Sequence, residues 1–366
     1  MALSKILPAS QEQYVGARNI IINGNMAVAQ RGTLTGQGGS ANEYAAVDRY
    51  QLVLSGAKTP RITSSQQSTT VGEFSSQLKL DCTTLQSSVS AADLFAVRQR
   101  IEGQNLQHLQ YGTSSAKTLS ATFTITSPKS GIHCLQLHNR DANYSYVREF
   151  TVDTANTAQR ISVTFPGYTA SALDNDTESS LELSWPLLAG SNWQGSKDGW
   201  NSGNYFATSN QQNLLDNTSN DFLITGIQLE VGDVATPFEH ESVAETLRKC
   251  QRYFYRIGGD FETAATGTNA GRFASGVMIS ATASVLMRPN PVTMRDAPNV
   301  TFDDAVSAYT LMTSRTTNAV TAVGDNQSTA STTAFGLTSG VTSNDGDGAV
   351  LRSTRGTSTI SISAEL

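Results

Sequence analysis

Apolar and polar residues alternate with a period of two along much of this chain. In KTLSATFTIT (117–126), apolar residues from Leu119 to Ile125 occupy one parity and hydroxyl-bearing residues occupy the other. This alternation predicts an antiparallel strand with one buried and one solvated face. The pattern recurs in ISVTF (161–165), SLELSW (180–185), GVMISATASVL (276–286), NVTF (299–302) and STISIS (358–363).

The segment DFLITGIQLEVG (221–232) contains a change of register. Its apolar residues alternate on one parity as far as Ile224 and on the opposite parity from Ile227 onward. A one-residue slip would turn the rest of the strand to the wrong face. We therefore predict a β-bulge at Gly226, which restores the orientation of the following side chains.

One segment has helical spacing. Ser242 and Glu245 form a capping-box pattern, which is typical of a helix N-terminus. Lys249 follows Glu245 at the i,i+4 spacing of a favourable ion pair. Four residues then predict one buried helix face: Val243, Leu247, Cys250 and Phe254.

Many short strands separated by polar turns favour an all-β fold, with two β-sandwich or jelly-roll domains joined by a short helix. The Ser/Thr/Gly/Asn-rich region beyond about residue 305 is expected to form strands with long loops. The predicted organisation is an N-terminal arm (1–18), a jelly-roll domain (19–239), a linker helix (240–257) and a second β-sandwich (258–366).

Composition supports this fold class. Only 15% of the 366 residues are charged, while Ser and Thr together make up roughly a quarter, above ordinary usage. Hydroxyl-bearing residues suit exposed strand faces. The net charge of -6, without a run of Lys or Arg, argues against nucleic acid as a ligand.

The three cysteines, Cys82, Cys134 and Cys250, are far apart and form no CxxC pair, so we expect free thiols. The N-terminus has no apolar segment of secretory length, and no stretch approaches the roughly 20 apolar residues of a membrane span. These features predict a soluble protein that is made without a signal peptide and does not insert into a membrane.

Metal and catalytic chemistry find little support. His133 and His138 have opposite parity in a strand-like segment, so they cannot share one metal ion. The Gly-rich segment 190–197 lacks the order of a P-loop. The acidic segment 174–178 is interpreted as a solvated turn, with a structural Ca²⁺ site as the alternative. We therefore predict no catalytic residue, no metal and no cofactor.

The loop SNWQGSKDGWNSGNYF (191–206) is the candidate binding site. It combines Trp193, Trp200 and Tyr205 with short amide and hydroxyl side chains. Such a combination is typical of surfaces that bind sugars or proteins. In the alternative interpretation, Trp200 and Phe206 cap the sandwich core.

Several motifs together resemble a family of bacteriophage and prophage virion proteins, namely tail fibres and minor structural proteins. The motifs are RNIIINGNMAVAQRG (18–32), VDRYQL (47–52), FAVRQRIEG (95–103), ITGIQLEVGDVATPFEHESVAETLRKCQRYFYRI (224–257), PVTMRDAPNVTF (291–302) and ISAEL (362–366). The resemblance implies a central domain similar to jelly-roll carbohydrate-binding modules and a non-enzymatic virion part, often trimeric.

Physical considerations assign scaffold roles to the motif residues. Asn23 and Gly24 suit a turn between strands, and Pro237 with Phe238 closes the first domain. With Gly226 at the bulge and Cys250 and Phe254 on the helix, all are interpreted as structural.

The resulting expectation is a virion protein that assembles in the host cytoplasm. We expect a homotrimeric tail fibre or spike component that is attached to other virion proteins through residues 1–18 and contributes to recognition of a host-surface glycan. A capsid or tail decoration or adaptor protein with a purely structural role is the alternative, and a glycan-degrading depolymerase is a more distant one.

Overall fold

The structure is a computed structural model that describes residues 18–56, 60–258, 272–314, 316–324, 328–340, 343–353 and 358–366. Antiparallel strands dominate these residues, which contain a single α-helix. The predicted all-β class is therefore confirmed. Of the predicted arm (1–18), only Arg18 lies within the described residues. No helix in the described ranges is long and apolar enough to cross a bilayer.

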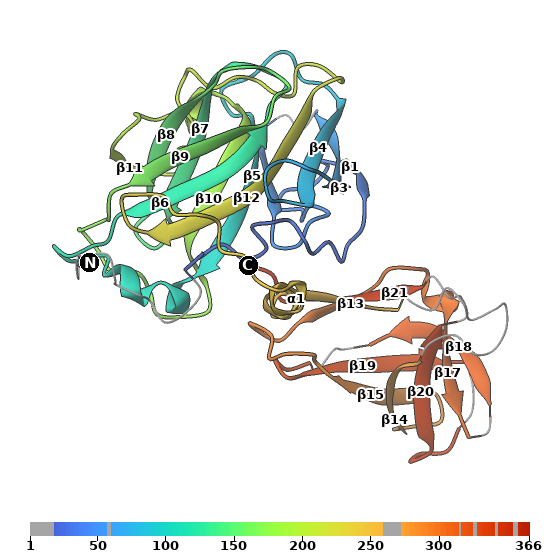
Figure 1. The fold of residues 1–366 in the computed structure, drawn as a ribbon. Helices are drawn as coiled ribbons and strands as arrows, with labels where there is room; N and C mark the ends of the chain where they lie inside the picture. Colours follow the sequence, from blue (N-terminus) through green and yellow to red (C-terminus); the bar gives the residue numbers. More distant parts are fainter. Residues whose placement is uncertain are drawn as a thin grey trace, which may run out of the picture. The chain divides into compact units, whose positions relative to one another are not determined.

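The chain forms two compact units (Figure 1). The first contains residues as far as Ala27, Thr33–Glu43 and Tyr50–Glu241, and the second contains Val28–Gly32, Tyr44–Arg49 and Ser242–Leu366. Two short N-terminal segments thus belong to the same unit as the C-terminal third of the chain.

The first unit is a sandwich of two six-stranded sheets, ordered β1-β3-β4-β12-β6-β9 and β11-β8-β7-β10-β5-β2 (Figure 1). Aromatic rings fill the space between the sheets: Phe123 meets Trp185 at 5.6 Å and Phe150 at 5.3 Å between centroids, both edge-on. The strands are β1 (Leu34–Gln37), β2 (Gln51–Ser55), β3 (Arg61–Ser68), β4 (Ser76–Thr84), β5 (Leu94–Glu102), β6 (Leu119–Thr126), β7 (Gly131–Asn139), β8 (Tyr144–Val152), β9 (Gln159–Phe165), β10 (Ser179–Ala189), β11 (Trp200–Ser202) and β12 (Asp221–Val231). Short 3-10 helices lie at η2 (Gly103–Asn105), η3 (Gln107–Leu109) and η4 (Ser191–Trp193).

The predicted bulge is present in β12. Its pairing with β6 shifts register between Thr225 and Gln228. Gly226 has φ +62°, and a Cβ atom there would lie 2.4 Å from the Phe74 ring. Phe74 in turn packs edge-on against Phe238, with centroids 5.0 Å apart. The bulge glycine and the Pro237–Phe238 motif are therefore joined through one aromatic ring.

The N-terminal motif docks on the same strand. The Asn19 side chain donates to the Ile227 carbonyl at 3.0 Å and accepts from the Leu229 amide at 3.0 Å. Asn23 adopts φ +61° in the predicted turn, and the Ile227 amide donates to the Gly24 carbonyl at 2.9 Å. The turn is not flanked by two strands, as the sequence suggested. It lies against the bulge, so motifs about 200 positions apart in the sequence form one contact region.

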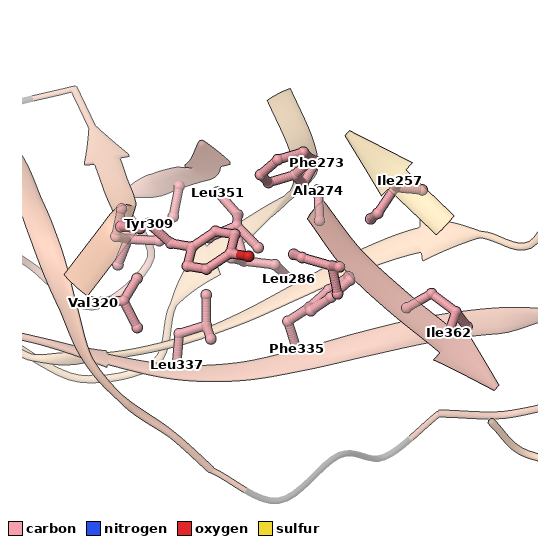
Figure 2. Close-up of a cluster of buried hydrophobic side chains, with 14 of the residues drawn as sticks. Ile257, Phe273, Ala274, Leu286, Tyr309, Val320, Phe335, Leu337, Leu351 and Ile362 are labelled. Carbon is pink, nitrogen blue, oxygen red and sulfur yellow. The ribbon is translucent and has the colours of Figure 1, made fainter. Parts of the chain in front are cut away.

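The second unit contains a closed six-stranded barrel, ordered β14-β15-β19-β18-β17-β20, and a three-stranded sheet ordered β13-β21-β16 (Figure 1). Figure 2 shows Leu286, Tyr309, Phe335 and Leu351 converging in its apolar core. The elements are α1 (Val243–Gln251), β13 (Phe254–Gly258), β14 (Arg272–Met278), β15 (Ala283–Pro289), β16 (Asn299–Phe302), η5 (Val306–Ala308), β17 (Tyr309–Thr313), β18 (Thr317–Val323), β19 (Thr332–Ser339), β20 (Gly348–Ser353) and β21 (Thr359–Ser363).

The second unit differs from the sequence prediction in two respects. A barrel closed between β14 and β20 takes the place of an open two-sheet sandwich. The segment 276–286, which resembled one strand, turns back on itself as the β14–β15 hairpin. Strands predicted at 299–302 and 358–363 are present as β16 and β21. Strands also form beyond residue 305, as expected.

The helix is shorter than predicted, and its buried face is different. Ser242 caps α1, because its side chain accepts a hydrogen bond from the Glu245 amide at 3.2 Å. Glu245 pairs with Arg248 at 2.8 Å. Val243 is 59% exposed, whereas Cys250 is fully buried. The assignment of Phe254 to the helix was wrong: this residue begins β13, where the guanidinium of Arg31 lies 3.6 Å from its ring centroid.

Candidate functional site

The outer face of the sheet β11-β8-β7-β10-β5-β2 is covered by the segment that follows β10. A small apolar cluster forms under this segment, centred on the fully buried Phe206. Trp193 and Tyr205 pack at its edge. Two of the three predicted binding aromatics therefore lie together, on the side of the sheet that faces away from the sandwich core.

Trp193 is fixed by the protein itself. Its indole N–H donates to the Ala92 carbonyl at 2.9 Å, and its ring meets Phe206 edge-on at 5.8 Å. Tyr205 is held by its backbone amide, which donates a hydrogen bond to the Ser145 hydroxyl oxygen at 3.0 Å, and its ring lies over Gly195 and Gly203. Both rings remain partly exposed.

Trp200 belongs to a different aromatic group. In β11 it packs edge-on against Tyr146 at 5.5 Å and Tyr168 at 5.0 Å, and it also meets Tyr111. Its indole N–H donates to the Pro166 carbonyl at 3.2 Å. The structure therefore does not bring Trp200 into the cluster that contains Trp193 and Tyr205.

A pocket of about 340 Å³ opens beside the loop that carries Trp193, although the Trp193 side chain is not among its lining residues. Its walls carry no charged side chain; they are formed by Val89, Ala91, Ala189, Gly190, Ser191, Gln194, Gln211 and Asn213. Gly190 is required at the wall because the backbone of a neighbouring segment approaches closely there: a Cβ atom at this position would lie 2.0 Å from the Ser90 carbonyl oxygen. The sequence prediction included the loop but not these amides, which look like ordinary turn residues in the sequence.

Hydrogen bonds within the protein fix the amides of the pocket. Gln194 donates through Nε2 to the Ala189 carbonyl at 2.9 Å, and Asn213 donates to the Gln86 carbonyl at 2.8 Å. Gln211 accepts from the Cys134 amide at 2.7 Å. No described residue donates to Oε1 of Gln194 or bonds the Ser191 hydroxyl. The wall of this neutral pocket therefore presents the carbonyl oxygen of a fixed Gln194 amide and the hydroxyl of Ser191.

A second polar group on the same sheet face is centred on Glu182. This fully buried carboxylate accepts hydrogen bonds from Arg98 at 3.0 Å, Arg100 at 2.8 Å and Arg140 at 2.9 Å. His138 lies 3.3 Å away through Nδ1. Burial raises the pKa of Glu182, but the hydrogen bond from His138 and the charges of Arg98 and Arg100 outweigh it, so the pKa lies well below its ordinary value.

The two histidines of β7 lie on opposite faces, in agreement with the alternation. His133 stacks on Phe150 at 5.8 Å, and burial lowers its pKa, whereas His138 faces Glu182. Among the residues with described positions, no three His, Cys, Asp or Glu side chains gather as a metal site would require.

The three cysteines are free and buried. Burial raises the pKa of Cys82 to about 11, and it also raises the pKa of Cys134 and Cys250. These thiols therefore remain protonated near neutral pH and are poor nucleophiles.

Comparison with known proteins gives distant structural similarities. No protein-family profile matches the sequence. No curated protein sequence matches it either. The enzymatically active domain of tailspike protein 4 from bacteriophage CBA120 is similar with a TM-score of 0.31 and 8% identity, over 59% of this chain and 22% of that one.

Carbohydrate-binding modules are similar at the same level. The family 11 module of the cellulase Lic26A-Cel5E from Clostridium thermocellum has a TM-score of 0.27 and 13% identity, over 57% of this chain and 96% of the module. A family 61 module, solved in complex with β-1,4-galactotriose, has a TM-score of 0.27 and 8% identity, over 59% of this chain and 100% of the module. These similarities assign no family.

Proposed function

We propose that this chain is a non-enzymatic bacteriophage virion protein, a tail fibre or spike component, whose first unit binds a neutral host-surface glycan. The observation that carries the glycan proposal is the uncharged pocket beside the loop that carries Trp193, with its walls of amide, hydroxyl and small apolar groups. The virion role is supported by the sequence motifs, two of which, 18–32 and 224–257, form one contact region around β12.

The chemistry of the pocket suits a sugar. Sugar hydroxyls both donate and accept hydrogen bonds, and Gln194 Oε1 and the Ser191 hydroxyl can serve them without loss of an internal bond. The absence of charge on the walls favours a neutral sugar over an acidic one, since a buried carboxylate needs a partner of opposite charge. Trp193 is partly exposed and belongs to the loop that contributes Ser191 and Gln194 to the wall, so that loop also carries an apolar ring that could contact a sugar.

The remaining parts of the proposal concern assembly. The protein is a homotrimer, it attaches to other virion proteins through residues 1–18, and it joins the particle in the host cytoplasm. Symmetric homo-oligomers are the usual form of such assemblies.

A decoration or adaptor protein without a receptor is the second candidate. It is favoured by the internal hydrogen bonds of both loop tryptophans, because the indole N–H groups of Trp193 and Trp200 are already used by the Ala92 and Pro166 carbonyls. Aromatic residues that hold a loop in place do not require a ligand.

A pocket-blocking variant separates the two candidates. Ser191→Trp places a large side chain at the pocket wall, whereas Ser196→Trp makes the same change at an exposed position of the same loop outside the wall. On an array of neutral and acidic bacterial surface glycans, we expect the unmodified protein and S196W to bind neutral glycans and S191W to lose binding.

Two other outcomes would contradict parts of this proposal. Absence of glycan and cell binding by the unmodified protein, together with retention on virus particles, would support the decoration role. Release of soluble sugar from host polysaccharide would contradict the non-enzymatic assignment.

A further inference from the structure

The outside of the barrel carries an exposed apolar surface. Val277 is 47% exposed, Ile279 53% and Met287 57%, and all three lie on or beside the paired strands β14 and β15. Val277 pairs with Val285, and Ser275 pairs with both Met287 and Val350, so these side chains form neighbouring rows. We call the surface formed by Val277, Ile279, Ala283, Val285, Met287 and Val350 the barrel face.

The apolar side chains of the barrel face belong to the outer side of the strands and are not core residues left partly uncovered. Residues of opposite parity on the same strands, such as Leu286 and Leu351, are fully buried inside the barrel (Figure 2). Gly336 and Gly348, which pair with Val285 and Val277 in the adjoining strands, have no side chains to cover this face. Exposed apolar surface of this kind typically marks an interaction site.

The two ends of the barrel face carry opposite charges. Arg272 pairs with Arg352 at one end of β14 and β20. At the other end, the Gly346 amide donates to the Met278 carbonyl and the Met278 amide donates to the Asp347 carbonyl, which places Asp345 and Asp347 there. Since strands rise roughly 3.3 Å per residue, the basic and acidic ends are about 20 Å apart.

We propose that the barrel face is covered by a second copy of this chain, with the basic end of one copy against the acidic end of the next. Self-association through strand pairing is not available here, because the barrel is closed and has no free edge. Contact must then be made by side chains. A copy of the same surface supplies both the apolar area and the complementary charges.

The first test concerns the apolar centre of the face. Val277→Lys places a charge there at a side chain that is already half exposed, so folding should be retained. Val234→Lys is the matched control, since Val234 is 73% exposed and lies in the first unit. By light scattering and native mass spectrometry at micromolar concentration, we expect the unmodified protein and V234K to be oligomers. V277K should be a monomer with an unchanged circular dichroism spectrum.

The second test concerns the charged ends. Arg272→Glu and Asp345→Arg should each weaken association about tenfold, in the range of a single lost charge contact at an interface. The double variant restores the opposite charges and should recover most of the affinity. Both effects should shrink as salt is raised.

Several results would overturn the proposal. A monomeric unmodified protein, an oligomer that survives V277K, or a double variant as weak as the worse single variant would each contradict it. A dimer is the expected assembly, because a surface that covers a copy of itself is related to it by a two-fold axis, and a dimer would contradict the proposed homotrimer. Glycan binding by V277K is expected to be unchanged, so the two proposals can fail separately.

Discussion

The outward-facing side of the β10 sheet and the outward-facing side of the barrel differ in polarity and in burial. On β10 of the sandwich, Glu182 and Ser184 point away from the core and are fully buried. On β14 of the barrel, Val277 points away from the core and is half exposed. One unit therefore covers a polar face, and the other leaves an apolar face open to solvent.

This difference separates two kinds of constraint. On a covered polar face a charged group needs a partner, since an unpartnered buried charge is costly; Glu182 has three arginine partners, whereas the buried Ser184 hydroxyl has none among the described residues. An open apolar face costs little within the monomer but favours association. The covered sheet face borders a small pocket, whereas the barrel offers an open apolar surface.

The largest expected effect is the loss of the buried carboxylate. Glu182→Gln removes the negative charge that Arg98, Arg100 and Arg140 share. Breaking a buried ion pair costs about 3–5 kcal/mol. We expect a loss of this size in urea unfolding followed by tryptophan fluorescence, because Trp185, Trp193 and Trp200 all lie in the first unit. Glu178→Gln, at an exposed carboxylate just before β10, should change little; equal effects would refute the special role of Glu182.

Neighbouring positions of β20 test the inside and outside of the barrel. Leu351→Ala opens a cavity in the core seen in Figure 2 and should cost about 3 kcal/mol. Val350→Ala removes side-chain atoms from the barrel face and should cost less than about 0.5 kcal/mol in the monomer. Calorimetry measures both. A cost at Val350 as large as that at Leu351 would show that the barrel face is part of the monomer core.

A substitution at the bulge of β12 should cause a smaller loss of stability, and a second glycine with positive φ provides the control. Gly226→Ala combines a positive φ with a Cβ contact of 2.4 Å to Phe74, and we expect a loss of about 2–3 kcal/mol in the free energy of unfolding. Gly72 also has a positive φ, +58°, but its Cβ position is 4.0 Å from the nearest Phe74 atom. Gly72→Ala should therefore report the backbone strain alone, about 1 kcal/mol. If the two variants lose the same stability, the close packing on Phe74 contributes nothing.

Acid should affect the two units in opposite directions, with shifts of a few degrees in melting temperature. The lowered pKa of Glu182 stabilises the first unit above its unfolded value of 4.5, and this contribution is lost as the pH falls below 4.5. Burial raises the pKa of Asp48, in the second unit, from 3.8 to about 6. Its contribution is complete below pH 3.8 and is lost as the pH rises through 6.

Calorimetry from pH 7 to pH 3.5, with tryptophan fluorescence to mark the first unit, measures both shifts. The second unit should gain stability between pH 7 and pH 4, and Asp48→Asn should remove this gain. Parallel shifts of both transitions would contradict the assignment of these two carboxylates.

Local features of the fold could be predicted where one face of a strand is buried and the other is solvated. The strand 159–165 follows its alternation, and the parity change at Gly226 indicates the observed bulge. The strand 119–126 is present, but the predicted solvated face is wrong over its first half, because Ser120 and Thr122 are buried. The same rule failed to reveal the environment of Glu182, which alternates like a solvated residue but is covered by arginine side chains from β5 and from Arg140. The sequence contained one indication of this environment, namely the two arginines of FAVRQRIEG and the glutamate of SLELSW, which the structure brings together.

Long-range features could not be predicted from pattern alone. Closure of the barrel depends on pairing between β14 and β20, which are about 75 positions apart in the sequence. The pocket beside the loop that carries Trp193 depends on amides whose partners, such as Ala189 and Gln86, are set by loop packing. Phe254 fits a helical period but is drawn into β13 by its pairing with Ser363.

The place of β21 has a consequence for the order of events during synthesis. This strand lies between β13 and β16, so each of these two strands lacks its partner until β21 is present. The ion pairs that Arg31 and Arg49 form with Glu365 also cannot form before this region has been synthesised. The first unit has all its strands once residue 231 has emerged from the ribosome, whereas β13 and β16 of the second unit have no strand partner until residue 363 follows. Chaperones that act on nascent chains should therefore engage the second unit for longer than the first.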